Sequence, residues 1–239
     1  MGNYNDMANP ILGTAQTPTP NLEQSLNFYK RLGFEVLSSG NIPMVSDGKL
    51  VIEINPGRKA RAGIKLYNDH WSEVADQLEA YSVVTEEEGI IAATDPNGVY
   101  LYLCKTPPPE LITTNSESFA LTGNFAGISI ESLNFDRSLQ FWKTVGYNIT
   151  SGGAEQGWVS MSNGGNLDLS IMTAGACPHL FFNPSFTYFN SGQNLQVIQN
   201  VRDAGIPITE EITSFNQEGI VDNIIIRDPG GFGFFLFND

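Results

Sequence analysis

Histidine, cysteine and basic residues are scarce in this 239-residue chain. The two histidines, His70 and His179, are too few for a metal site of three or more imidazoles within one chain. The two cysteines, Cys104 and Cys177, make no disulfide framework, which fits a reducing, cytoplasmic compartment. Lys and Arg number 12 against 26 Asp and Glu, and the resulting net charge of −14 argues against nucleic-acid partners and against anionic membrane surfaces.

Long hydrophobic runs are also missing. The longest apolar stretches, such as Val99–Cys104 and Phe234–Phe237, have the length of strands and not of membrane spans. No apolar segment follows a basic start, so we expect no secretory signal. With 41% apolar residues, the chain can nevertheless build one or two ordinary cores.

An internal repeat organises the chain. Residues 21–40 and 134–153 align without a gap and share Asn, Ser, Leu, Phe, Lys and Gly at matching places. The ends of the two halves match as well, because the turns Asp95–Gly98 and Asp228–Gly231 each precede a hydrophobic run. We therefore expect two tandem domains, 10–106 and 119–239, joined by a proline-rich linker over 107–118 and preceded by a loose tail over 1–9.

Each half alternates strand-like and helix-like segments. Asn21 and Asn134 are predicted N-caps, and Gly33 and Gly146 are predicted ends, of helices with apolar residues at i, i+4 and i+7. Second helices are expected over 71–81 and 195–204. Strands are expected over residues 11–16, 50–55, 99–104, 125–131, 166–173, 186–189, 221–227 and 232–237. This order predicts an α+β fold with two βαβββ modules in each half.

In this order and spacing the motifs resemble those of the vicinal oxygen chelate superfamily, which includes glyoxalase I, bleomycin-resistance proteins and extradiol dioxygenases. The resemblance rests on Asn-Leu-Glu-x-Ser-Leu-x-Phe-Tyr from Asn21, its second copy from Asn134 and the two Asp-Pro-x-Gly turns. It implies four βαβββ modules forming two tandem glyoxalase/bleomycin-resistance-like domains. Each domain would be a half-open mixed β-barrel around a cleft, with helices outside. In the superfamily's enzymes, that cleft holds a divalent metal.

The resemblance also implies four metal-ligand positions in each domain. In the first domain they fall on Thr14, Glu53, Gly63 and Tyr102, and in the second on Gly127, Ser170, Thr187 and Phe235. Zn, Ni, Fe and Mn sites need several imidazole or carboxylate donors, which these positions do not supply. We therefore expect no metal and no cofactor in either cleft, although adventitious binding at Cys177 and His179 stays open.

Strand alternation predicts what lines the clefts instead. In the first cleft the ligand-binding candidates are Thr14, Gln16, Glu53, Lys65, Tyr100 and Tyr102. In the second, more apolar cleft they are Ser129, Ser170, Met172, Thr187, Phe235 and Phe237, with Trp158 and Phe189 beside them. Aromatic walls with a few polar groups suit a flat organic ligand, although the phenylalanines could also fill a cleft that closed when its metal was lost.

Glu53 admits two interpretations. If Lys65 pairs with it, the ammonium neutralises a stranded buried carboxylate. If it is unpaired, Glu53 is a candidate proton acceptor, with Tyr102 as a donor or orienter. Cys104 is expected to be a buried thiol and not a nucleophile.

Three functions remain open. The first is metal-independent binding of a small aromatic molecule, as in the bleomycin-resistance branch. Because the net charge is acidic, this ligand class includes cationic aromatic molecules. The second is a lyase, isomerase or dioxygenase-like enzyme that uses Glu53 as base or an unrecognised metal site, whereas metal-dependent glyoxalase or dioxygenase activity is not expected. The third is an interaction module with vestigial clefts. The sequence is compatible with domain pairing within a monomer and with a homodimer.

Overall fold

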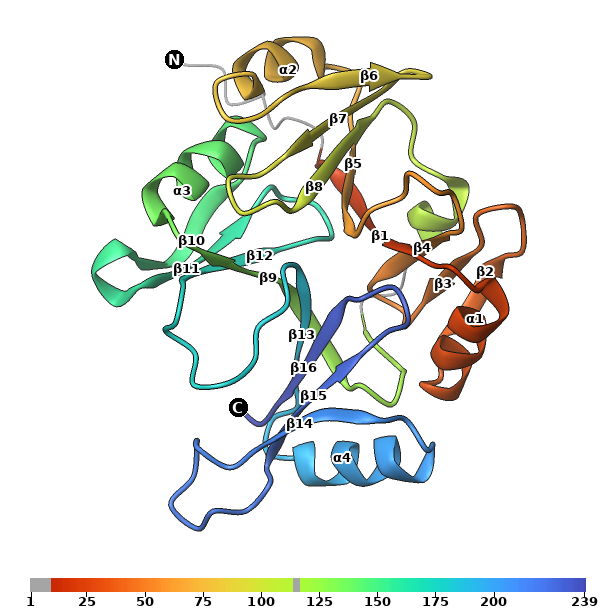
Figure 1. Cartoon of the computed structure of the whole chain (residues 1–239), viewed down its shortest axis with the longest axis vertical. Helices are drawn as coiled ribbons and strands as arrows, with labels where there is room; N and C mark the ends of the chain where they lie inside the picture. The colour runs from red at the N-terminus through yellow and green to blue at the C-terminus, as the bar shows by residue number, and fades with distance from the viewer. Residues whose placement is uncertain (1–9, 114–116) are drawn as a thin grey trace, which may run out of the picture.

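Two eight-stranded mixed sheets, one from each half of the sequence, make up the fold (Figure 1). The computed structural model describes residues 10–113 and 117–239, so the expected tail over 1–9 lies outside the described residues. The first half contains β1 (Leu12–Pro18), α1 (Leu22–Arg31), β2 (Glu35–Ser38), β3 (Met44–Ser46), β4 (Val51–Asn55), β5 (Gly63–Tyr67), α2 (Ser72–Leu78), β6 (Thr85–Glu87), β7 (Ile90–Thr94) and β8 (Tyr100–Cys104). The second contains β9 (Asn124–Ser132), α3 (Phe135–Thr144), β10 (Asn148–Gly153), β11 (Trp158–Ser162), β12 (Leu169–Thr173), β13 (Ser185–Phe189), α4 (Asn194–Asp203), β14 (Ile208–Ile212), β15 (Asn223–Arg227) and β16 (Gly233–Phe237).

The two sheets have the same topology. The strand orders are β2-β3-β4-β1-β5-β8-β7-β6 and β10-β11-β12-β9-β13-β16-β15-β14. Each sheet contains two βαβββ modules, one in each half of the sheet. The first strands of the two modules pair antiparallel at the centre. Each sheet is open at both ends, and the helices lie at the periphery (Figure 1). The predicted architecture of four modules in two half-open domains is therefore confirmed.

The first helix of each half begins and ends as the sequence predicts. The side chain of Asn21 accepts a hydrogen bond from the backbone N–H of Gln24 at 3.0 Å, and Asn134 accepts one from Arg137 at 3.1 Å. A side-chain acceptor at this position satisfies an N–H that has no partner within the helix. Gly33 and Gly146 follow the helices with φ of +85° and +105°, a conformation that favours glycine.

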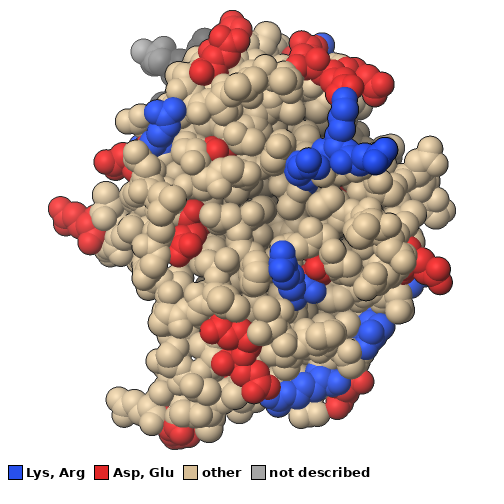
Figure 2. Space-filling view, viewed as in Figure 1, with Lys and Arg blue, Asp and Glu red and all other residues tan. Residues whose placement is uncertain are grey.

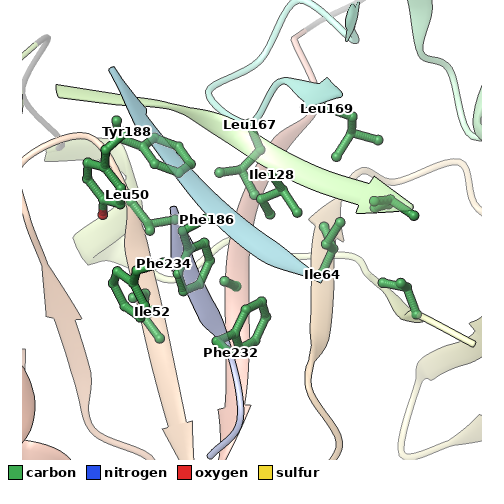
Figure 3. Close-up of a cluster of buried hydrophobic side chains, with 14 of the residues drawn as sticks. Leu50, Ile52, Ile64, Ile128, Leu167, Leu169, Phe186, Tyr188, Phe232 and Phe234 are labelled. Carbon is green, nitrogen blue, oxygen red and sulfur yellow. The ribbon is translucent and has the colours of Figure 1, made fainter. Parts of the chain in front are cut away.

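The apolar faces of the two sheets pack against each other and form one shared core. Leu50 and Ile52 of the first half face Phe186, Tyr188 and Phe234 of the second, as Figure 3 shows. Strand alternation places the opposite faces of both sheets away from this core. Pairing of the two domains within one chain is thus present in the structure, while the oligomeric state stays a prediction.

Buried aspartates at two hairpin turns link the halves. Tyr29 of α1 donates a hydrogen bond to Asp228 Oδ2 at 2.7 Å, and Thr17 of β1 donates to the same oxygen at 2.6 Å. Tyr188 of β13 donates to Asp47 Oδ2, between β3 and β4, at 2.9 Å. Burial raises the pKa of both carboxyls, and the hydrogen bonds oppose that rise.

The predicted linker is described only in part. A 3-10 turn spans Pro109–Thr113, and residues 114–116 lie outside the described part, so the exact domain boundaries stay predictions. No helix within 10–113 and 117–239 is long and apolar enough to cross a membrane. On the face shown in Figure 2, the described basic side chains form small groups separated by acidic and uncharged residues.

Candidate functional site

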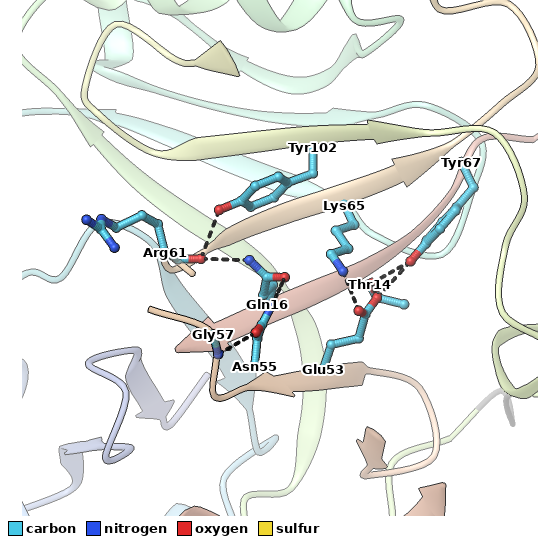
Figure 4. Close-up of polar contacts among 9 residues, drawn as sticks. All are labelled: Thr14, Gln16, Glu53, Asn55, Gly57, Arg61, Lys65, Tyr67 and Tyr102. Atoms are coloured by element: carbon cyan, nitrogen blue, oxygen red, sulfur yellow. Dashed lines mark hydrogen bonds and ion pairs between the residues drawn. The ribbon is translucent and has the colours of Figure 1, made fainter. Parts of the chain in front are cut away.

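A buried ion pair occupies the polar face of the first sheet. Lys65 Nζ contacts Glu53 Oε2, and the two side chains are only 10% and 9% exposed. Glu53 Oε1 accepts hydrogen bonds from Thr14 and Tyr67, each at 2.7 Å (Figure 4). Both carboxylate oxygens are therefore already engaged by donors, and an acid–base role for Glu53 would require one of these contacts to break.

Tyr67, and not Tyr102, is the tyrosine that contacts Glu53. Burial and the negative charge of Glu53 raise the pKa of the Tyr67 phenol, which keeps it protonated as a donor. The Tyr102 hydroxyl instead donates to the carbonyl of Arg61 at 3.4 Å, which also accepts from Gln16 at 3.1 Å. The Tyr102 hydroxyl therefore does not contact Glu53 here, and its role as a donor or orienter for an unpaired Glu53 stays a prediction. Tyr67 shares its strand and its parity with Lys65, so alternation could have identified it.

The register of the sheets corrects one assigned metal position. Lys65 pairs with Thr14 on one side and with Tyr102 on the other, as Thr187 pairs with Gly127 and Phe235 in the second sheet. Lys65 is therefore the equivalent of Thr187, and the assignment of Gly63 is wrong. On β1 the corresponding position lies seven residues before the helix cap. On β5 this spacing does not hold, because the cap Trp71 lies closer to Lys65.

A cavity of about 480 Å³ opens beside the ion pair. Glu53 and Lys65 line it, together with Tyr67, Met44 and Cys104. Burial raises the pKa of the Cys104 thiol to about 11, consistent with the expected inert thiol. The remaining predicted residues of this cleft lie on the same sheet face but not along this cavity: Thr14, Gln16, Tyr100 and Tyr102.

The second domain has a cavity of about 350 Å³ with a different character. All six residues predicted for this cleft line it: Ser129, Ser170, Met172, Thr187, Phe235 and Phe237. Trp158 and Phe189 line it too. The phenyl rings of Phe235 and Phe237 stack with centroids 5.6 Å apart, and they leave the cavity open.

The segment between β12 and β13 contributes residues that strand alternation could not predict. Cys177, His179 and Phe181 line the cavity from this segment. The Phe181 ring lies edge-on to Phe235 at 4.9 Å, and the His179 ring lies 5.2 Å from Phe235. His179 Nδ1 lies 2.7 Å from the carbonyl oxygen of Leu180, a contact that requires the proton on Nδ1.

Two carboxylates hold this segment in place. Glu131 Oε1 accepts from the backbone N–H of Gly175, and Glu210 Oε2 accepts from that of Leu180, each at 2.7 Å. Asn183 adds two hydrogen bonds to the backbone of Glu131, both 2.8 Å long. The side chains that cover the cavity are therefore anchored at both ends of the segment.

The donor sets at the implied metal positions do not fit a divalent metal. In the first domain the corrected set is Thr14, Glu53, Lys65 and Tyr102, and the ammonium of Lys65 already neutralises the one carboxylate. In the second domain the set is Gly127, Ser170, Thr187 and Phe235, none of which carries an imidazole or a carboxylate. Within the described residues, no three His, Cys, Asp or Glu side chains come together as a possible metal site.

Known structures share the arrangement of these two domains. A catechol 2,3-dioxygenase matches with a TM-score of 0.59 and 15% sequence identity, over 95% of this chain and 87% of that chain. A Mn(II)-bound glyoxalase from Novosphingobium aromaticivorans matches with a TM-score of 0.57 and 15% identity, over 96% and 81%. An extradiol ring-cleaving dioxygenase from B. fuscum gives 0.55 and 15%, over 96% and 71%. No family model and no curated protein matches the chain.

These likenesses establish the fold. The chain has the tandem-domain fold of this dioxygenase and this glyoxalase, as its sequence motifs predicted. At 15% identity, the fold does not carry the activity of those enzymes with it.

Proposed function

We propose that this protein binds a small aromatic molecule, without a metal, in the cavity of the second domain. The observation that carries the proposal is the lining of that cavity. It joins aromatic walls from Trp158, Phe235 and Phe237 with hydroxyls from Ser129 and Thr187. Ligand sites in proteins are typically concave and mostly apolar, with a few polar groups that fix orientation.

The first domain supports a structural role better than a catalytic one. Its ion pair satisfies Glu53 on both oxygens, as an internal counter-charge does for a buried carboxylate. Among the described residues, no ion pair lines the second cavity. For this reason the proposal places binding in the second domain.

Equilibrium dialysis with 2-naphthol, in parallel buffers with and without EDTA, tests the proposal. We expect saturable binding to the wild-type protein at one equivalent. Ser170→Trp should abolish it, because the indole would fill the cavity from β12. Ser151→Trp is the matched control, since Ser151 is an exposed residue of β10 outside the cavity. Far-UV circular dichroism should show that both variants are folded.

The outcomes separate the functions left open by the sequence. Absence of saturable binding to the wild-type protein would overturn the proposal and favour an interaction module with vestigial clefts. Equal binding by wild-type protein and Ser170→Trp would place the ligand elsewhere. Binding that disappears with EDTA, together with one equivalent of bound metal after dialysis against Zn²⁺, Ni²⁺, Mn²⁺ or Fe²⁺, would favour a metal-dependent enzyme.

A further inference from the structure

A row of hydroxyl groups crosses the floor of the second cavity. Ser160 on β11 is registered with Ser170 on β12, which is registered with Ser129 on β9. Thr187 on β13 continues the row, with its hydroxyl 2.6 Å from that of Ser129. All four residues line the cavity. Four adjacent strands thus each present one neutral group that can both donate and accept a hydrogen bond.

Half of this row lacks a partner within the protein. Ser129 and Thr187 share one hydrogen bond and are almost completely buried, and this bond uses only one of their two hydroxyl protons. The hydroxyls of Ser160 and Ser170 have no hydrogen-bond partner among the described residues, and both side chains are half-buried. Polar groups at the floor of an otherwise apolar cavity favour a ligand that can hydrogen-bond to them.

Charge is absent from the same lining. No Asp, Glu, Lys or Arg is among the described residues that line the cavity. The carboxylates of Glu131 and Glu210 bind backbone N–H groups of the covering segment instead. A charged ligand would therefore lose its hydration without gaining an ionic partner. The net charge of −14 is spread over the molecule and does not supply one at this site.

We propose that the ligand is a neutral, planar aromatic molecule with hydrogen-bonding atoms along one edge, bound with that edge on the hydroxyl row. This inference rests on the proposed function and specifies its ligand class. The ring would lie between Trp158, Phe235 and Phe237. Recognition would come from hydrogen bonds to Ser170 and to the Ser129–Thr187 pair.

The strand spacing also favours one arrangement of polar atoms. Neighbouring strands lie about 4.8 Å apart. Two oxygens in a 1,3 relation on one aromatic ring have about this separation, whereas two oxygens on adjacent carbons are only about 2.8 Å apart, the length of one hydrogen bond. A 1,3-diol can therefore place one oxygen opposite Ser170 and the other opposite the Ser129–Thr187 pair, whereas the oxygens of a 1,2-diol lie closer together than the two groups that they would face.

Isothermal titration calorimetry with a matched set of naphthalenes tests the inference, with EDTA present throughout. The set is naphthalene, 2-naphthol, naphthalene-1,3-diol, naphthalene-2,3-diol, 2-naphthoate and 2-naphthyltrimethylammonium. We expect 2-naphthol to bind about three- to tenfold more tightly than naphthalene, the effect of one hydrogen bond. The 1,3-diol should gain a similar factor over the 2,3-diol. Both ions should bind more weakly than 2-naphthol.

Variants of the row give a second readout. Ser170→Ala should reduce the affinity for the 1,3-diol by about three- to tenfold and leave the affinity for naphthalene unchanged. The double variant Ser129→Ala/Thr187→Val should do the same, because it removes the hydroxyl that would bind the ligand together with its partner, so neither is left unpaired. Ser151→Ala is the control, since this exposed serine continues the row on β10 outside the cavity.

Each outcome distinguishes this inference from the proposed function. If none of the six compounds binds, the proposed function itself fails. If naphthalene binds as tightly as 2-naphthol, or if the ammonium compound binds most tightly, the cavity binds aromatics and the inference about a neutral polar edge is wrong. If the 2,3-diol binds more tightly than the 1,3-diol, the match to the strand spacing is wrong.

Discussion

Removal of Lys65 should strongly destabilise the first domain. In the variant Lys65→Met, the carboxylate of Glu53 would remain buried with hydrogen bonds but without a counter-charge. The side chains of this pair are only 10% and 9% exposed, so water compensates the remaining charge less well than the ammonium does. Breaking a buried ion pair by removing one partner costs about 3–5 kcal/mol, because the remaining charge is uncompensated.

The double variant Glu53→Gln/Lys65→Met should recover most of this loss. A neutral glutamine can still accept the hydrogen bonds from Thr14 and Tyr67, and it leaves no charge to bury. Lys59→Met is the matched control, because Lys59 contacts Glu87 at 3.2 Å with side chains 87% and 74% exposed. An exposed pair of this kind contributes about 0–1 kcal/mol.

Urea unfolding at pH 7, followed by far-UV circular dichroism, measures these differences. The midpoint should fall most for Lys65→Met, recover in the double variant and change little for Lys59→Met. A midpoint for Lys65→Met within experimental error of the wild type would refute the reasoning. So would a double variant no more stable than the single one, because the cost would then not come from the stranded charge.

Three further predictions concern other buried groups. Tyr29→Phe removes a 2.7 Å hydrogen bond to the buried Asp228 and should lower the free energy of unfolding by about 1–3 kcal/mol in urea titrations. Because burial raises the pKa of Asp228 above 3.8, its contribution to stability is greatest below that pH and is lost as the pH rises through the folded-state pKa. The urea midpoint of unfolding should therefore decline less for Asp228→Asn than for the wild type between about pH 3.5 and 6.5, a window that begins near the unfolded pKa of an aspartate. An equal decline of the two midpoints would contradict this prediction. Iodoacetamide at pH 8 should label Cys177 before Cys104, whose pKa is about 11, as mass spectrometry of the native protein can show; equal labelling would contradict the burial argument.

Local chemistry explains why much of the fold could be predicted. Asn21 and Gly33 mark the two ends of α1 because a side-chain cap and a positive φ depend on the residue itself and its immediate neighbours. The parity of the strands follows from a period of two, which is independent of the rest of the fold. For this reason all six residues predicted for the second cleft line one cavity.

Such local patterns do not predict which residues of distant segments face each other. The equivalence of Lys65 and Thr187 depends on which residues face each other across β1, β5 and β8, and a count along the chain placed it two residues away. The contact of Tyr67 on β5 with Glu53 on β4 depends on side-chain reach across the intervening strand β1, so the order and register of the strands are needed to predict it.

The sequence by itself determined the repeat, the modules and the scarcity of metal donors, because each is a property of residue identity and short-range spacing. Only the tertiary structure decided that Glu53 is neutralised by Lys65, that this ion pair lines the first cavity, and that a segment carrying Cys177 and His179 lines the second. These features depend on contacts between residues far apart in the chain, and such contacts exist only once the sheets have formed and packed.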